Sequence, residues 1–123
     1  MARIVVVDDS QMILDLMQQI LEVDGHRVYS FLKPSQMLDW IKNEPAPNLI
    51  ILDYHMPEIT GKQLSESLQK FGLSHETKII LLTTDFVAAG RLFGQNPQTN
   101  VCGWLLKPPK VELIRKAVTK ALG

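Results

Sequence analysis

Five polar residues stand where apolar runs of the chain end, and their types could do chemistry together. They are Asp8, Asp9, Asp53, Thr83 and Lys107. Carboxylates that lie close together raise each other's pKa, and a bound divalent cation removes that repulsion. Oxygen ligands without a cluster of His or Cys favour magnesium, which can take a further oxygen from a bound phosphate. The residue types therefore predict an Mg²⁺ site beside which a phosphoryl group could be held.

The same residues offer the groups that phosphoryl transfer requires. Lys107 supplies a mobile positive charge and Thr83 a hydroxyl donor, which together with Mg²⁺ could hold the peripheral oxygens of a transferring phosphoryl group. Asp53 can act as the nucleophile and form an aspartyl phosphate. Lys107 also precedes a predicted helix, where a cation opposes the helix dipole, so its position favours an anion nearby.

The elements that must position these residues are short apolar runs alternating with helical patterns. The predicted strands cover Arg3–Val7, Arg27–Phe31, Leu49–Leu52, Lys78–Leu82 and Val101–Leu106. The predicted helices begin after Ser10, at Pro34, after Gly61, at Phe86 and at Pro109, and the fourth of them is weak because of Gly90, Gly94 and Pro97. Such alternation predicts parallel βαβ units with helices on both faces of the sheet. Right-handed crossovers bring the carboxyl ends of all strands to one edge, where ligands bind in folds of this kind.

The run Leu49–Leu52 is the centre of this arrangement. Four consecutive apolar residues after Pro47 and Asn48 are typical of a strand buried on both faces. Met56 and Pro57 prevent a helix from starting at once, because the residue before proline is pushed toward extended geometry. Asp53 is therefore expected at the mouth of a loop.

Composition limits the function classes that remain. A chain of 123 residues predicts one domain, and 13 basic residues balance 13 acidic ones, so the overall charge does not point to nucleic acid or anionic membrane. The longest apolar runs have four residues, and the N-terminus carries no signal-peptide pattern. The single Cys102 suits a reducing cytoplasm and is expected to be a small buried residue. The methionines at positions 12, 17 and 37 are expected in the core.

At this point the chain resembles a known family, the receiver domains of bacterial two-component response regulators. The motifs that carry the resemblance are Val5–Ser10, Leu52–Pro57 with Gly61, Leu82–Thr84 and Trp104–Pro108. The resemblance spans the chain from Arg3 to the last helix. It implies a single receiver domain over residues 1–123 with a flavodoxin-like α/β fold, a five-stranded parallel doubly wound sheet in strand order 2-1-3-4-5 flanked by five helices.

The resemblance also implies a role for each residue of the site. Asp53 is the phosphoacceptor, and Mg²⁺ is held by Asp8, Asp9, Asp53 and the backbone carbonyl of His55. Thr83, Thr84 and Lys107 bind the phosphate. Thr83 and Trp104 form the switch, His55 and Asp85 tune the lifetime of the phosphoryl group, and the bond from Lys107 to Pro108 is cis.

The function implied is that of a signalling domain in a phosphorelay rather than an enzyme. The phosphoryl group would come from a histidine kinase or a phosphotransfer protein and would alter the surface of the fourth helix, fifth strand and fifth helix. A downstream effector domain or protein, or a second copy of the chain, would dock on that surface. No direct contact of this domain with nucleic acid or with a membrane is expected, and the predicted location is the cytoplasm.

Three alternatives remain open. A receiver-like module could bind partners constitutively, without phosphorylation. A phosphatase of the haloacid dehalogenase type also uses a strand-end Asp and magnesium, but it needs an acid two residues later, where this chain has His55. A flavodoxin-like flavin carrier would need a phosphate-cradling first loop, and Asp8 and Asp9 would repel that phosphate.

Overall fold

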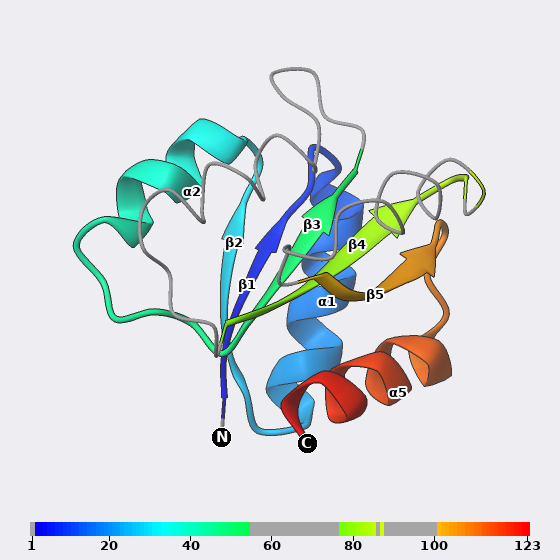
Figure 1. The fold of residues 1–123 in the computed structure, drawn as a ribbon. Coiled ribbons are helices and arrows are strands. Elements are labelled where there is room, and N and C mark those ends of the chain that lie inside the picture. The colour runs from blue at the N-terminus through cyan, green and yellow to red at the C-terminus, as the bar shows by residue number, and fades with distance from the viewer. Residues whose placement is uncertain (1, 55–76, 86, 88–100) are drawn as a thin grey trace.

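Five parallel strands form one twisted sheet in the computed structural model, which describes residues 2–54, 77–85, 87 and 101–123 (Figure 1). The strands are β1 (Arg3–Val7), β2 (Arg27–Phe31), β3 (Leu49–Asp53), β4 (Lys78–Thr83) and β5 (Val101–Leu106). Their order across the sheet is β2-β1-β3-β4-β5, and every neighbouring pair is parallel. This confirms the predicted topology. The strands β3 and β4 each include one polar residue, Asp53 and Thr83, beyond the predicted apolar run.

Three helices lie within the described residues. The helix α1 (Gln11–Val23) begins at Ser10, whose Oγ accepts a hydrogen bond from the Ile13 N–H at 3.4 Å, and ends before Gly25, which has the left-handed φ of 89°. The helix α2 (Pro34–Ile41) starts on a proline, whose missing N–H costs nothing in the first turn. The helix α5 (Val111–Leu122) closes the chain. The helices predicted after Gly61 and at Phe86 fall outside the described residues, so the count of five stays a prediction.

The core has two layers, one on each face of the sheet. The helices α1 and α5 cover one face and α2 lies on the other (Figure 1). Leu49 and Ile51 of β3 pack in the layer beneath α1 and α5, whereas Ile50 and Leu52 pack in the layer beneath α2. All five residues of β3 are buried, because the strand is central and both of its faces are covered. Because side chains on both faces of this strand are buried, its sequence is an unbroken apolar run from Leu49 to Leu52.

Two expectations about buried side chains were wrong. Met12 is 79% exposed, because it lies two residues before Leu14 and so on the opposite side of α1, whereas Met17 and Met37 are fully buried as expected. Cys102 is exposed rather than buried, because it lies on the edge strand β5 beside a register irregularity between Ile79 and Ile80. Among the described residues, the structure contains no helix with the length and apolar character that a membrane span requires.

Candidate functional site

Three carboxylates gather at the carboxyl ends of β1 and β3. These strands are neighbours, and the pairing of Val7 with Leu52 places the next residues, Asp8 and Asp53, side by side. Asp8 and Asp53 are buried and Asp9 is exposed, and each of the three offers an oxygen within 4.8 Å of the others. The parallel topology thus brings together the three acids that the sequence predicted as metal ligands.

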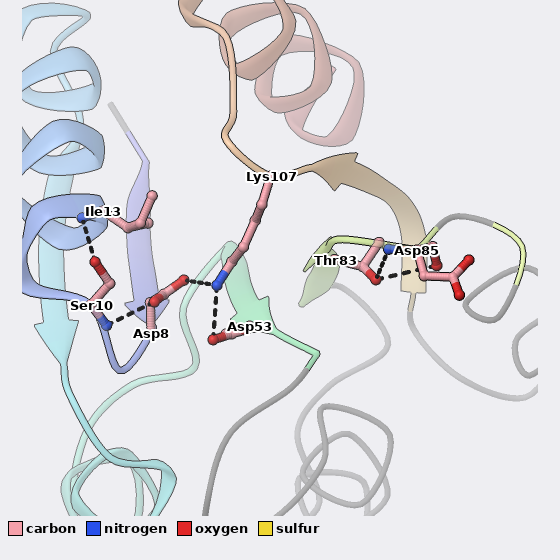
Figure 2. Close-up of polar contacts among 7 residues, drawn as sticks. All are labelled: Asp8, Ser10, Ile13, Asp53, Thr83, Asp85 and Lys107. Carbon is pink, nitrogen blue, oxygen red and sulfur yellow. Dashed lines mark hydrogen bonds and ion pairs between the residues drawn. The ribbon is translucent and has the colours of Figure 1, made fainter.

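Lys107 reaches this cluster from β5, which lies two strands away from β3 in the sheet. It follows β5, which is separated from β3 by β4, and its backbone N–H donates to the Thr83 carbonyl at 2.8 Å. Its Nζ lies 2.9 Å from Asp8 Oδ2 and 2.9 Å from Asp53 Oδ2, so the ammonium sits between two buried carboxylates (Figure 2). The peptide bond between Lys107 and Pro108 is cis, the isomer that the resemblance implied.

The electrostatics of the cluster favour a further cation. Burial of the Lys107 ammonium lowers its pKa, but hydrogen bonds and charge from Asp53 and Asp8 outweigh this and raise the pKa above its ordinary value. Three carboxylates against one ammonium still leave a net charge of −2 when all are ionised. All the ligand atoms are hard oxygens, and the ammonium already shows that a cation is stabilised there. The residues present therefore fit Mg²⁺.

Asp8 is held in place by a neighbour that the sequence analysis treated only as a helix cap. Its Oδ1 accepts a hydrogen bond from the Ser10 backbone N–H at 2.9 Å, while its Oδ2 faces Lys107 (Figure 2). An Asp two residues before a helix cap can bond the backbone in this way, so the pattern Asp8-Asp9-Ser10 carried a usable signal. Ser10 thus orients a candidate metal ligand as well as starting α1.

The Thr83 hydroxyl is not in contact with the acidic cluster. It accepts a hydrogen bond from the Asp85 N–H at 3.0 Å and donates to the Asp85 carbonyl at 3.3 Å, and Figure 2 shows it turned toward Asp85 and away from Lys107. Thr84 and Asp85 are exposed at the end of β4. Of the predicted phosphate-binding residues, Lys107 is in direct contact with the predicted phosphoacceptor Asp53.

Trp104 lies near Thr83 across the β4–β5 pair. Thr83 is paired with Leu106, and Leu81 with Trp104, so the side chains of Thr83 and Trp104 point to the same face of the sheet from diagonal positions. The Trp104 side chain is 38% exposed. His55, the remaining predicted site residue, lies outside the described residues.

The fold and the site together define a flavodoxin-like α/β domain with an acidic pocket at the carboxyl edge of its sheet. The chain belongs to the response regulator receiver domain family, whose model matches residues 4–119. It is thus a receiver domain of two-component systems. Receiver domains bind Mg²⁺ at an acidic pocket, and Asp8, Asp9 and Asp53 form such a pocket here.

Two relatives match this chain in sequence over different shares of their own lengths. Protein PilH of Pseudomonas aeruginosa is 27% identical over 124 residues, covering 99% of this chain and 98% of PilH. Regulatory protein VanRc of Enterococcus gallinarum is 35% identical over 81 residues, which is 66% of this chain but only 33% of VanRc.

Solved structures agree in fold. The chemotaxis protein CheY4 of Vibrio cholerae superposes with a TM-score of 0.88 at 26% identity and 99% coverage of both chains. The response regulator TrrA of Thermotoga maritima, solved in complex with Mg²⁺–BeF, superposes with a TM-score of 0.80 at 26% identity, covering 99% of this chain and 100% of TrrA.

Proposed function

We propose that this chain is a phosphorylation-dependent signalling domain and that Asp53 accepts the phosphoryl group. The observation that carries the proposal is the placement of Lys107 Nζ at 2.9 Å from both Asp8 and Asp53 within a three-acid cluster. This arrangement combines a nucleophile, a fixed positive charge and a cation site within one pocket. Residues 1–123 would form a single receiver domain.

In the proposed reaction, an oxygen of Asp53 attacks the phosphorus of a phosphohistidine on a histidine kinase or phosphotransfer protein. The new O–P bond forms as the P–N bond breaks, and the departing imidazole keeps the electron pair and takes a proton. Lys107 faces the attacking carboxylate and would follow the charge onto the phosphoryl oxygens. Mg²⁺ held by Asp8, Asp9, Asp53 and the His55 carbonyl would supply charge neutralisation for those oxygens.

Thr83 would report the arrival of the phosphoryl group. To reach it, the hydroxyl must give up its two hydrogen bonds to Asp85, at a cost of about 0.5–1.5 kcal/mol each. A hydrogen bond to a charged phosphoryl oxygen contributes about 1.5–3 kcal/mol, enough to offset that cost. Since Trp104 lies on the same face of the neighbouring strand, a shift of Thr83 would open space into which Trp104 can turn.

The proposed roles of Thr84, Asp85 and His55 rest on their positions at the ends of β4 and β3. Thr84 and Asp85 are exposed beside the pocket, where Thr84 could contact the phosphate and Asp85, with His55, could govern the access of water. A downstream effector domain or protein would read the altered surface. The cytoplasmic location and the absence of an enzymatic activity stay predictions.

Labelling with radioactive acetyl phosphate tests the proposal. With Mg²⁺ present, the wild-type chain should take up label, and Asp53→Asn should reduce uptake to background. Asp15→Asn is the matched control, because Asp15 is an exposed carboxylate on α1 outside the cluster. Equal labelling of Asp53→Asn and wild type would overturn the assignment, and an unlabelled wild type would favour a receiver-like module that binds partners without phosphorylation.

A further inference from the structure

A cavity of about 520 Å³ lies where β5, the segment after it and α5 meet, at the edge of the sheet opposite β2 (Figure 1). The helix contributes Leu113, Lys116, Ala117 and Lys120, which share one face of α5 because they are three or four residues apart. A second cavity of about 370 Å³ adjoins the first and shares Trp104, Ala117 and Lys120 with it. We call the two together the lysine-rimmed cavity.

The volume of the lysine-rimmed cavity suits a small molecule. Ligand pockets in proteins measure about 300–1,000 Å³ and are lined mainly by apolar side chains with a few polar groups. A stable protein interface buries about 800 Å² on each partner and so extends well beyond a hollow of this size. The volume therefore favours a small organic ligand over a macromolecule as the occupant.

The floor of the larger cavity is apolar. Trp104, Leu106 and Leu113 line it and are 38%, 44% and 49% exposed, so a large apolar surface meets water there. A ligand with an apolar body would remove that surface from water, which is favourable in proportion to the area covered. The floor therefore selects a ligand with a hydrocarbon portion.

The rim of the cavity is positively charged. Four lysines line it that belong to none of the ion pairs among the described residues, whereas the ammonium of Lys107 is held in the acidic cluster. The four are Lys78, Lys110, Lys116 and Lys120. The described lining contains no Asp or Glu, so nothing in it offsets this charge. The rim therefore selects a ligand with an anionic head, while the lysine stems can cover its hydrocarbon portion.

The lining does not suit a nucleotide or a sugar phosphate. Such ligands carry hydroxyl groups and ring nitrogens that lose hydrogen bonds to water when they are covered, and each group left without a partner weakens binding. The described lining offers no Ser, Thr, Asn, Gln or Arg side chain to replace those bonds. A carboxylate on an unbranched alkyl chain has no polar group except its head and leaves nothing unsatisfied.

The spacing along α5 sets the length of the chain. Lys116 and Lys120 are four residues apart and can face one carboxylate together. From Lys120 to Leu113 is seven residues, or about 10 Å along the helix axis. An extended carbon chain covers roughly 1.2 Å per bond, so about eight or nine bonds span that distance.

We infer that the lysine-rimmed cavity binds a medium-chain fatty acid anion, with the carboxylate beside Lys116 and Lys120 and the alkyl chain over the apolar floor. This site is separate from the acidic pocket, since the pocket uses the carboxyl ends of β1 and β3. The inference goes beyond the proposed function and does not depend on phosphorylation of Asp53.

The probe is decanoate below its micelle concentration, titrated into the full chain carrying Trp40→Phe, in which Trp104 is the only tryptophan. The emission of Trp104 should shift to shorter wavelength and saturate, because the alkyl chain shields the indole from water. Decyltrimethylammonium has the same chain on a cationic head and should bind at least tenfold more weakly. Butyrate has the same head on a short chain and should cause no shift. Affinity for decanoate should fall as salt rises, because the rim charges are screened.

Two variants test the two halves of the cavity separately. Lys116→Gln combined with Lys120→Gln should weaken decanoate binding at least tenfold and should remove the preference over decyltrimethylammonium. Leu113→Ser should weaken decanoate binding at least tenfold without a change of charge. All three positions are exposed, so the substitutions leave the core unchanged, and melting curves check this.

Matched controls place the same changes on the opposite side of the sheet. Arg27→Gln combined with Lys33→Gln removes two positive charges at exposed positions on and beside β2. Leu32→Ser removes a leucine that is 42% exposed there. Neither control should alter decanoate binding, and Asp53→Asn should bind decanoate as tightly as the wild-type chain does.

Each outcome supports or overturns the inference. Saturable binding with the stated head and chain preferences, weakened by both cavity variants and by neither control, supports it. Equal affinity for decanoate and decyltrimethylammonium, a lack of saturable decanoate binding, or unchanged binding in either cavity variant overturns it. Binding to phosphatidylglycerol vesicles without binding of free decanoate also overturns it, in favour of a membrane surface.

Discussion

At the scale of single residues, the central feature of the site is the Lys107 ammonium, which forms ion pairs with two buried carboxylates. Asp8 and Asp53 are almost completely buried, and Lys107 is their common partner. Removing one partner of a buried ion pair leaves an uncompensated charge, which costs more than the intact pair contributes. The lysine therefore has a structural role that is independent of the proposed phosphoryl transfer.

We predict that Lys107→Met destabilises the chain by about 1–3 kcal/mol at pH 7 without Mg²⁺, because two buried like charges lose their counterion. Added Mg²⁺ should restore much of the loss. Since the pKa of Lys107 is raised in the folded chain, its stabilisation is fully present below the ordinary lysine pKa of about 10.4 and is lost as pH rises through the higher folded value. Urea unfolding with and without Mg²⁺ measures these effects.

Lys42→Met provides the control, since Lys42 is an exposed lysine paired with the exposed Asp39, and it should change stability by less than about 1 kcal/mol. A Lys107→Met chain as stable as wild type in the absence of divalent cations would contradict this structural role of Lys107.

At the scale of elements, the β4–β5 pair connects the pocket to the outer edge of the sheet. Thr83 closes β4 with its hydroxyl bonded to Asp85, and Trp104 lies diagonally from it on β5. Because paired residues of parallel strands point to the same face, the two side chains can exchange space without any change of strand register. A coupled movement is thus possible within a rigid sheet.

Tryptophan fluorescence can detect that movement. The chain has two tryptophans, so Trp40→Phe leaves Trp104 as the only one, with the packing of position 40 against Tyr29 and Phe31 retained by another aromatic ring. We predict a shift of Trp104 emission to shorter wavelength when Mg²⁺ and beryllofluoride are added, because inward rotation removes the indole from water.

The same chain carrying Asp53→Asn should show no shift. An unchanged emission maximum in a chain that nevertheless binds beryllofluoride would contradict the proposed switch role of Trp104.

At the scale of the whole molecule, acidic and basic side chains gather at different places on the fold, although the net charge of the chain is zero. Asp8, Asp9 and Asp53 converge at the carboxyl edge of the sheet, while the exposed Lys116 and Lys120 lie on α5. The cluster at the carboxyl edge is held together against repulsion by the fold. A cation bound there should therefore stabilise the folded chain as a whole.

We predict that Mg²⁺ raises the melting temperature by several degrees, since a ligand at 100 times its Kd contributes about 2.7 kcal/mol to the folded state. EDTA should reverse the rise. Asp9→Asn should reduce the Mg²⁺-dependent increment with little effect on the metal-free chain, because Asp9 is exposed, and Asp15→Asn should leave the increment unchanged. Differential scanning calorimetry measures both quantities, and equal increments in the two variants would exclude Asp9 as a ligand.

The alternation of strands and helices, the central position of Leu49–Leu52 and the gathering of Asp8, Asp9, Asp53 and Lys107 were all predictable from the sequence. The physical reason is that the spacing of apolar residues along a short segment indicates whether it forms a strand or a helix. Right-handed parallel connections then bring the carboxyl ends of the strands to the same edge of the sheet. The polar residues that follow or end three of these runs, Asp8, Asp53 and Lys107, therefore lie together.

Only the tertiary structure decided how the side chains share their partners. No local pattern states that Lys107 bridges two acids or that the Thr83 hydroxyl turns to Asp85. Such contacts depend on packing between distant segments, and packing is a property of the assembled fold.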